Sequence, residues 1–497
     1  MATKDTVSTM LHTSLQENIQ LFHRLLPLDS SFDFITRSIT LGSSHCYFIS
    51  INGMCDLDIM QRLFSDIEAE SFQVLSQKHK NRLPDFVKDQ FFYAQISFLT
   101  SVEEMIHGIL SGPSLLLIDG YTQGLLIDTR KYPSRSLDEP DTEKVLQGAK
   151  DGFVETLLTN CNLLRRRLRT PNLIFSLHTI GTLSKTDVAV SYLKQACDQR
   201  LLEEIQKKLN SINTSCLTMG IQSLKELMVK KSIFHPMPDF FLTSRPDVAA
   251  SYLAEGYILI LVDNSPFAMI LPCNVFQFIQ NPEDYYKAPL VGTYQRLIRF
   301  FCLINSLFLM PLVLYFSYHR EYLTDILQQL LPKEASFAAI FIYILFIELG
   351  LDLFKYASSH SANGYSSSLA IVGGLLIGDV AIRLSWTSDE IIFYGAATLL
   401  SSFAISNIPL SDAIKIYRLF LLFMIACFPK YGLWIGIFFL FLSLFTTPVF
   451  GKKSYFWPLF PFSAKDLMML LFRTPTFRAQ PEIPGKTFLS SSHSKRK

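Results

Sequence analysis

Three carboxylates lie close together in the stretch SRSLDEPDTEKVLQGAKDGFVETL, which runs from Ser134 to Leu157. Grouped carboxylates can serve acid–base or metal chemistry, and these three are Asp138, Glu139 and Asp141. No histidine lies nearby, and neither a phosphate-binding loop nor metal-ligand spacing accompanies them. A solvated turn before a helical segment near 142–150 explains the acids equally well, because the helix dipole stabilises acids at its amino end. We predict that the chain is not an enzyme and has no cofactor or metal site.

Four arginines follow this stretch on a predicted helix: Arg165, Arg166, Arg167 and Arg169. They could pair with the acids of a neighbouring copy, and we predict that the acids and the arginines together form a subunit interface. Two alternatives remain. The arginines could face anionic lipid headgroups, where each basic side chain contributes roughly 1 kcal/mol, or they could form a solvated face.

A second candidate site lies in the apolar segment SLAIVGGLLIGDVAIRL. Its small and acidic residues are Ser368, Gly373, Gly374, Gly378 and Asp379. Small residues allow close helix approach, and an ionised group facing lipid costs at least about 2.5–3.5 kcal/mol. In a ring of identical subunits Asp379 would form a ring of carboxylates that favours cations, so we predict that these residues line a pore. The alternative is a packing helix in which Asp379 pairs with Arg383, four residues on.

Glu348 and Asp352 lie four residues apart in another apolar segment, at about 336–354. Two ionised carboxylates on one helix face repel each other. We therefore predict that they have a polar surrounding, become protonated or find partners, and we treat them as candidate intramembrane acids.

The composition limits the class of protein. Hydrophobic residues make up 49% of the 497 residues and charged residues 18%, with a net charge of +2, so no electrostatic attraction to nucleic acid is expected. The eight cysteines include no CxxC pair, which supports neither a disulfide framework nor a zinc site. The first thirty residues have no continuous apolar stretch, so we expect no cleavable signal peptide and a cytoplasmic amino terminus.

The first 290 or so residues have the pattern of a mixed α/β region with two subdomains. Three apolar runs are interrupted by turn pairs, at Asn52-Gly53, Asp119-Gly120 and Asp263-Asn264, and each predicts a hairpin. The repetition suggests related sheets. Amphipathic helices are predicted at about 151–170 and 191–212.

From Tyr294 onward, long apolar segments predict an all-helical membrane domain with about six spans, or five by a competing count. The segment 414–447 is too long for one span and contains Pro429-Lys430 near its middle, so it is predicted to turn there. Six spans would place Lys355, then Lys415 and Arg418, and the basic tail in loops on the inner side. The expected regions are residues 1–30 (tail or helix), 31–130 and 131–292 (cytoplasmic α/β subdomains), 293–450 (transmembrane helices) and 451–497 (basic cytoplasmic tail).

The segment YPSRSLDEPDTEKVLQGAKDGFVETLLTNCNLLRRRLRTPNL resembles the signature block of spore germinant receptor A subunits, the GerA family. SKTDVAVSYL, SRPDVAASYLAEGYILILVDNSPFAMILP and AIVGGLLIGDVAI match further blocks in the same order. The loop SSHSANGYSSS departs from the family, whose members have a basic, proline-containing segment there.

The resemblance implies an integral protein of the spore inner membrane, with both termini in the cytoplasm, that acts in germination. It also implies a homo-oligomeric ring that releases ions, and other spore membrane proteins as partners. We accordingly expect a subunit of an ion-conducting pathway. One alternative is a nutrient-sensing subunit that signals without conducting, and a membrane-bound hydrolase or transferase is a third class.

Overall fold

The computed structural model describes residues 10–41, 44–56, 58–62, 95–132, 148–229, 235–332, 336–359, 388–447, 449–450 and 455–473. The chain forms two compact units. Unit 1 contains residues Met1–Lys230, Phe240–Pro272 and Ala479–Lys497, and unit 2 contains Lys231–Asp239 and Cys273–Arg478.

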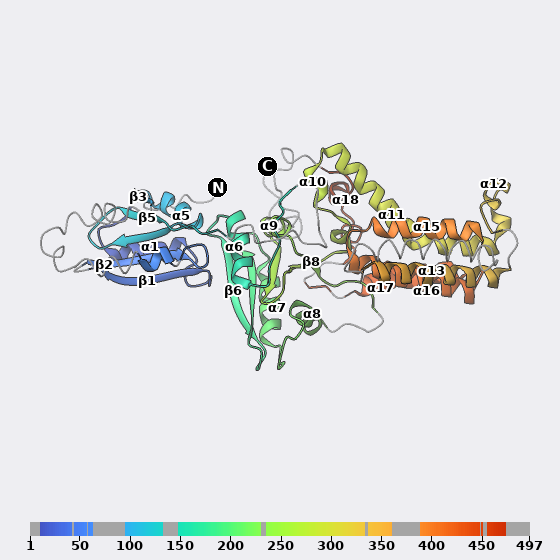
Figure 1. Ribbon diagram of the computed structural model, residues 1–497, viewed down its shortest axis with the longest axis horizontal. Helices are drawn as coiled ribbons and strands as arrows, with labels where there is room; N and C mark the ends of the chain where they lie inside the picture. The colour runs from blue at the N-terminus through green and yellow to red at the C-terminus, as the bar shows by residue number, and fades with distance from the viewer. Residues whose placement is uncertain are drawn as a thin grey trace. The chain divides into compact units, whose positions relative to one another are not determined.

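Unit 1 contains two antiparallel five-stranded sheets (Figure 1). The strands of the first are β1 (Phe34–Leu41), β2 (Ser44–Ile51), β3 (Gln95–Leu99), β4 (Ser114–Ile118) and β5 (Gly124–Asp128), in the order β1-β2-β4-β5-β3. Helices α1 (Leu15–Leu25) and α5 (Val102–Leu110) share one apolar core with alternate residues of the central strands. The α/β character predicted for this region is therefore confirmed.

The second sheet repeats the topology of the first. Its strands are β6 (Leu173–Ile180), β7 (Thr186–Leu193), β8 (Phe241–Thr243), β9 (Ile258–Val262) and β10 (Ala268–Leu271), in the order β6-β7-β9-β10-β8. Its helices are α6 (Leu157–Arg167), α7 (Gln199–Asn210), α8 (Ile221–Met228) and α9 (Pro246–Ala254). In both modules a helix precedes the first hairpin, and another joins the third strand to the fourth.

The same hydrogen bonds recur in both modules. The backbone N–H of Leu15, which begins α1, donates to Asp119 Oδ1 at 3.0 Å, and that of Leu157, which begins α6, donates to Asp263 Oδ1 at 3.1 Å. Asp119 lies in the turn between β4 and β5, and Asp263 in the turn between β9 and β10. Each aspartate accepts a hydrogen bond from a helix amide that has no partner within the helix. The sequence similarity of the turns thus reflects a common construction.

Two of the three predicted hairpins are confirmed and one is wrong. β4 pairs with β5, and β9 with β10, and the turn residues Gly120 and Asn264 have φ of 86° and 61°. After Asn52-Gly53 no strand returns along β2, because its two edges are already paired with β1 and β4. Gly53 still has a positive φ of 75°, so the turn itself exists.

The two predicted helices of this region begin later than expected. The first begins at Leu157 after Thr156 and not at Asp151, whose carboxylate instead accepts two hydrogen bonds from Arg167 at 2.6 Å. The second is α7, which follows the strand β7 and begins after Asp198, whose side chain accepts from the N–H of Arg200. In Thr186–Leu193 the consecutive residues Val188, Ala189 and Val190 are all buried, and a short continuous apolar run of this kind is typical of a central strand.

Unit 2 is helical. Its longer helices are α11 (Pro289–Tyr318), α13 (Phe337–Ser359), α15 (Asp389–Phe403), α16 (Ile408–Cys427) and α17 (Gly432–Thr446), which run side by side in Figure 1. Shorter helices are η3 (Val275–Ile279), α10 (Glu283–Tyr286), η4 (Arg320–Tyr322), α12 (Asp325–Gln328) and α18 (Ala464–Leu471). An apolar core formed by α11, α13, α15, α16 and α17 holds this bundle together.

In the part of the chain that the structure describes, fewer helices are long and apolar enough to span a membrane than the six, or five, spans predicted from the sequence. Within the described residues only α11 is long and apolar enough to cross a membrane, and α17 is a shorter apolar helix. The predicted turn near Pro429-Lys430 is confirmed, since α16 ends at Cys427 and α17 begins at Gly432. The segment 368–384 lies outside the described residues.

The structure also corrects part of the topology prediction. Lys355 lies in the last turns of α13, and Lys415 and Arg418 lie in the middle of α16. None of the three is in a loop, so their charges cannot be counted as loop charges on one side of a membrane.

Candidate functional site: a charge ladder in the helical bundle

Six charged residues form a ladder between two antiparallel helices of unit 2. The ladder is defined by the pairs Glu348–Arg418, Asp352–Lys415 and Lys355–Asp412. The residues on each helix follow at three- or four-residue spacing, so they project from one face. Helix α13 contributes the first member of each pair and α16 the second. Each pair joins opposite charges, so each rung is electrically neutral.

The most buried rung is the bidentate pair of Arg418 and Glu348. Arg418 Nε lies 2.6 Å from Glu348 Oε1, and Nη2 lies 2.7 Å from Oε2. The remaining guanidinium nitrogen, Nη1, donates to the backbone oxygen of Ser306 on α11 at 2.7 Å and to its hydroxyl at 3.3 Å. Glu348 is 2% exposed and Arg418 5%. A planar guanidinium matches a carboxylate in this geometry, and the pair joins three helices through one buried contact.

The other two rungs are progressively more exposed. Lys415 forms an ion pair with Asp352, and the two side chains are 24% and 37% exposed. Lys355 Nζ lies 2.8 Å from Asp412 Oδ1, with exposures of 35% and 57%. The ladder therefore leads from the accessible end of α13 into the bundle interior, where solvent screening is weakest.

Apolar side chains surround the inner end of the ladder. Ile344 lies one turn before Glu348 on α13 and Leu422 one turn after Arg418 on α16, and both are fully buried. An unpaired charge in such a place would be strongly unfavourable, so the two ions depend on each other. Because Glu348 pairs with Arg418 and Asp352 with Lys415, the two carboxylates do not stand on one helix face as unpaired like charges.

Sequence reasoning identified the two acids but not their partners. Asp412, Lys415 and Arg418 recur every three residues in an otherwise apolar segment, the same signal as the acids on α13. Treating two of them as loop residues hid that signal. Among the described residues no cluster of histidine, cysteine and acidic side chains could hold a metal ion.

The predicted arginine cluster divides between the interior and the surface of unit 1. Arg165 is fully buried: its Nε lies 2.9 Å from Asp33 Oδ2, and its other nitrogens donate to the backbone oxygens of Thr170 and Leu173. Its guanidinium also lies 5.1 Å from the ring centroid of Phe175. This corrects the interface prediction for Arg165, because a buried guanidinium that pairs within its own chain does not reach another subunit.

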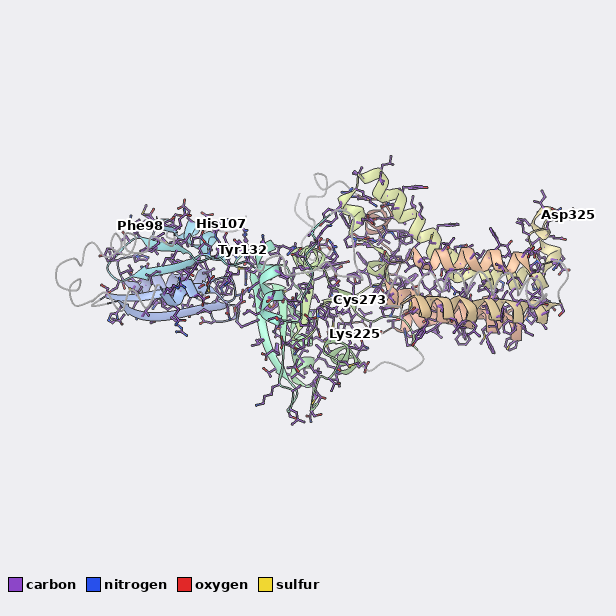
Figure 2. All side chains as sticks on the ribbon, in the orientation of Figure 1. Phe98, His107, Tyr132, Lys225, Cys273 and Asp325 are labelled. Carbon is purple, nitrogen blue, oxygen red and sulfur yellow. The ribbon has the colours of Figure 1, made fainter. Side chains whose placement is uncertain are left out.

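The other members of this cluster have different surroundings. Arg167 pairs with Asp151 and is half-buried, whereas Arg166 and Arg169 are exposed. The guanidinium of Arg166 lies 4.6 Å from the ring centroid of Tyr132, which Figure 2 labels. Arg166 and Arg169 therefore remain candidates for a subunit interface.

Two groups of predicted site residues lie outside the described residues. They are the acids Asp138, Glu139 and Asp141, and the pore candidates Ser368, Gly373, Gly374, Gly378 and Asp379. Their roles stay predictions from the sequence.

Comparison with known proteins gives a consistent result. Residues 23–483 match the family model described as Bacillus/Clostridium GerA spore germination protein. The chain is 32% identical over 469 residues to stage V sporulation protein AF of Bacillus subtilis (strain 168), covering 94% of each chain. It is 26% identical to the uncharacterized membrane protein YfkQ of the same organism, covering 95% of this chain and 91% of the relative.

One solved structure is also similar in sequence. It is the crystal structure of the N-terminal domain of the A subunit of the Bacillus megaterium spore germinant receptor GerK3, at 26% identity. The match covers 52% of this chain and 95% of that one, with a TM-score of 0.41.

Proposed function

Since this chain belongs to the Bacillus/Clostridium GerA spore germination protein family, we propose that it is an integral membrane subunit that contributes to an ion-conducting pathway in germinating spores. The observation that carries the proposal is the charge ladder, which places six ionisable side chains along one helix–helix seam of an apolar bundle. Ionisable residues among apolar helices are costly and are typical of ion and proton pathways.

The outer surface of the bundle supports the membrane location. Large apolar side chains on its helices are strongly exposed, among them Phe301 (68%), Phe393 (68%), Leu400 (70%), Trp434 (66%) and Phe438 (64%). Water-soluble monomers rarely expose apolar patches of more than a few hundred Å². Hydrocarbon would cover these faces, while the ladder stays inside the protein. We place the complex in the spore inner membrane, with both termini on the cytoplasmic side.

The pathway itself would be formed by several copies of the chain, arranged as a ring. In that arrangement the predicted segment with Gly373, Gly374, Gly378 and Asp379 would line the axis, and the ladder would hold the helices behind it in place. Exposed arginines of unit 1, Arg166 and Arg169, would contribute to contacts between copies.

A second function is favoured by one specific feature of the ladder. Every rung is internally neutral, and Arg418 uses all three of its nitrogens within the chain. A helix–helix contact in which every charge is paired within the chain suits a subunit that senses a germinant and transmits a change of helix position without conducting ions itself.

Ion flux separates the two functions. The purified complex, with its oligomeric mass confirmed, is reconstituted in K⁺-loaded liposomes. A conducting subunit releases K⁺ well above empty liposomes. Asp412→Asn, at the exposed end of the ladder, is expected to slow release severalfold, while Asp325→Asn leaves it unchanged. Asp325 is an exposed carboxylate of α12 and is labelled in Figure 2. Release no faster than from empty liposomes, from an intact oligomer, would favour the sensing function.

A further inference from the structure

A second group of buried charges lies at the beginning of α11, where α10 and α18 pack against it (Figure 1). Asp284 is 1% exposed and accepts from two arginines of α11. Arg296 Nε lies 3.1 Å from Asp284 Oδ2, and Arg299 Nη2 contacts Oδ1. Arg299 also donates to the backbone oxygen of Ile279 at 2.7 Å. One carboxylate thus orients two guanidinium groups on one face of the helix.

A third arginine joins this group from the residues after α18. Arg473 Nη2 donates to the backbone oxygen of Tyr285 at 2.7 Å, and the backbone N–H of Arg473 donates to Thr293 Oγ1 at 3.1 Å. A Cβ atom at Gly292 would lie 2.7 Å from the backbone oxygen of Asp284 and 3.0 Å from Arg473 Cδ, so glycine permits the close approach of both α10 and Arg473. Gly292 is one helical turn before Arg296, whose guanidinium lies 5.0 Å from the ring centroid of Tyr285. The two arginines therefore meet the same tyrosine.

Three of their donor nitrogens have no hydrogen-bond acceptor among the described residues. These atoms are Arg296 Nη2 and Arg473 Nε and Nη1, and all three are buried. Arg296 as a whole is only 3% exposed. Its Nη1 donates to the carbonyls of Met469 and Leu470 at the end of α18, at 3.3 Å each. Buried charged donors without acceptors are costly, so an acceptor from outside the chain that reached these nitrogens would be stabilising.

The surrounding charge favours an anion. Arg296 and Arg299 share the single carboxylate of Asp284, and Asp466 of α18 accepts a hydrogen bond from the hydroxyl of Ser463. Glu283 and Lys287, at α10, neutralise each other at 3.0 Å. An arginine fork matches the oxygens of a phosphate group in planar, two-point contacts.

The surface around the site indicates where such a phosphate would come from. Exposed aromatic and apolar side chains surround it, namely Tyr285 (54%), Leu290 (82%), Tyr294 (64%), Met468 (64%) and Phe472 (47%). Tyrosines next to apolar residues and basic groups are typical of the membrane–water boundary. The apolar stretch of α11 continues directly from this point.

We propose that Arg296 and Arg473 form a binding site for a phosphate group, supplied by the headgroup of an anionic phospholipid. The lipid source rests on the membrane location proposed above, whereas the phosphate chemistry rests on the arginines alone. The site fixes α18 and the first turns of α11 to one depth at the membrane surface.

Native mass spectrometry of the full-length complex in detergent tests the proposal, with phosphatidylglycerol, phosphatidylcholine and inorganic phosphate as probes. The wild type is expected to retain phosphatidylglycerol in preference to phosphatidylcholine. Arg473→Gln should weaken that retention about tenfold, the effect of losing one charge-assisted contact, and Arg473→Lys should weaken it less. Arg320→Gln, near the other end of α11, is the matched control and should change nothing. Arg296→Gln removes the other arginine of the site, but Arg296 is buried and this variant can fail to fold. Arg473 is only half-buried, so its substitution tests the site in either case.

The outcomes separate the source of the phosphate from the existence of the site. Competition by millimolar inorganic phosphate, lost in Arg473→Gln, would support a phosphate site fed from solution. Equal retention of both lipids by the wild type, together with no phosphate effect, would overturn the proposal. None of these results depends on ion release, so the site can fail while the proposed pathway holds, and the reverse.

Discussion

Removing the guanidinium of Arg418 provides a demanding test of the charge ladder. In Arg418→Met, Glu348 keeps its place at 2% exposure but loses both hydrogen bonds, at 2.6 and 2.7 Å, and the backbone oxygen of Ser306 loses its donor. Leaving one member of a buried ion pair without its partner costs about 3–5 kcal/mol. We expect the free energy of unfolding of the complex to fall by roughly this amount.

The double variant Glu348→Leu/Arg418→Met separates the pair from the space it fills. Replacing both ions by apolar residues of similar size is often neutral or stabilising by about 1–4 kcal/mol, so we expect the double variant to be more stable than Arg418→Met alone. A double-mutant cycle completed with Glu348→Leu should give a coupling of at least about 1 kcal/mol. Helix content, measured by circular dichroism during denaturant titration in detergent micelles, reports the unfolding.

Two results would refute this reasoning. One is an Arg418→Met protein within about 1 kcal/mol of the wild type, which would mean that Glu348 finds water or another donor. The other is a double variant as unstable as the single one, which would mean that the arginine acts through packing and not through its charge.

Three further predictions concern unit 1. Asp33→Asn leaves the buried guanidinium of Arg165 without its carboxylate and should lower the free energy of unfolding, measured by denaturant titration, by about 3–5 kcal/mol. Arg130→Ala breaks a more exposed pair with Asp128 and should cost no more than about 1 kcal/mol. Similar losses for both variants would contradict the role of burial. Asp119→Ala and Asp263→Ala each remove the acceptor for the first amide of a helix and should each cost about 1 kcal/mol, and a loss in only one module would argue against a shared construction. Burial raises the pKa of Glu255 to about 7, so the folded state holds this proton more tightly than the unfolded state. The free energy of unfolding should therefore fall by roughly 1–3 kcal/mol as the pH rises from about 4.5 to about 7. Glu255→Gln should reduce this pH dependence, and unfolding midpoints that change with pH as in the wild type would contradict the prediction.

The α/β region was predictable because local rules and the final fold agree there. Asp119-Gly120 and Asp263-Asn264 are turn pairs that tolerate positive φ, and they lie between apolar runs that pair as strands. The turn at Asn52-Gly53 has the same local signal but a different outcome, since β2 pairs with β1, directly before it, and with β4, which comes much later in the chain. Local chemistry predicts a turn, whereas the choice of partner strand is a property of the whole sheet.

The buried ion pairs were harder to predict for a related reason. Glu348 and Arg418 are 70 residues apart, and no local pattern specifies their pairing. Arg165 and Asp33 are 132 residues apart, and a run of arginines gives no sign that one of them is buried. The sequence does contain one signal for the pairing of Arg418. Arg418 is a basic residue among apolar helical positions and lies three residues from another charge, Lys415.

The most direct test of the ion pathway is the reversal potential of the reconstituted complex in a planar bilayer under a KCl gradient. We expect a cation-selective conductance in the wild type and a shift toward the nonselective value in Asp379→Asn, because the predicted ring of carboxylates would be neutralised. An identical reversal potential and conductance in the two proteins would remove Asp379 from the pathway. No conductance from a complex of confirmed oligomeric mass would contradict the central claim.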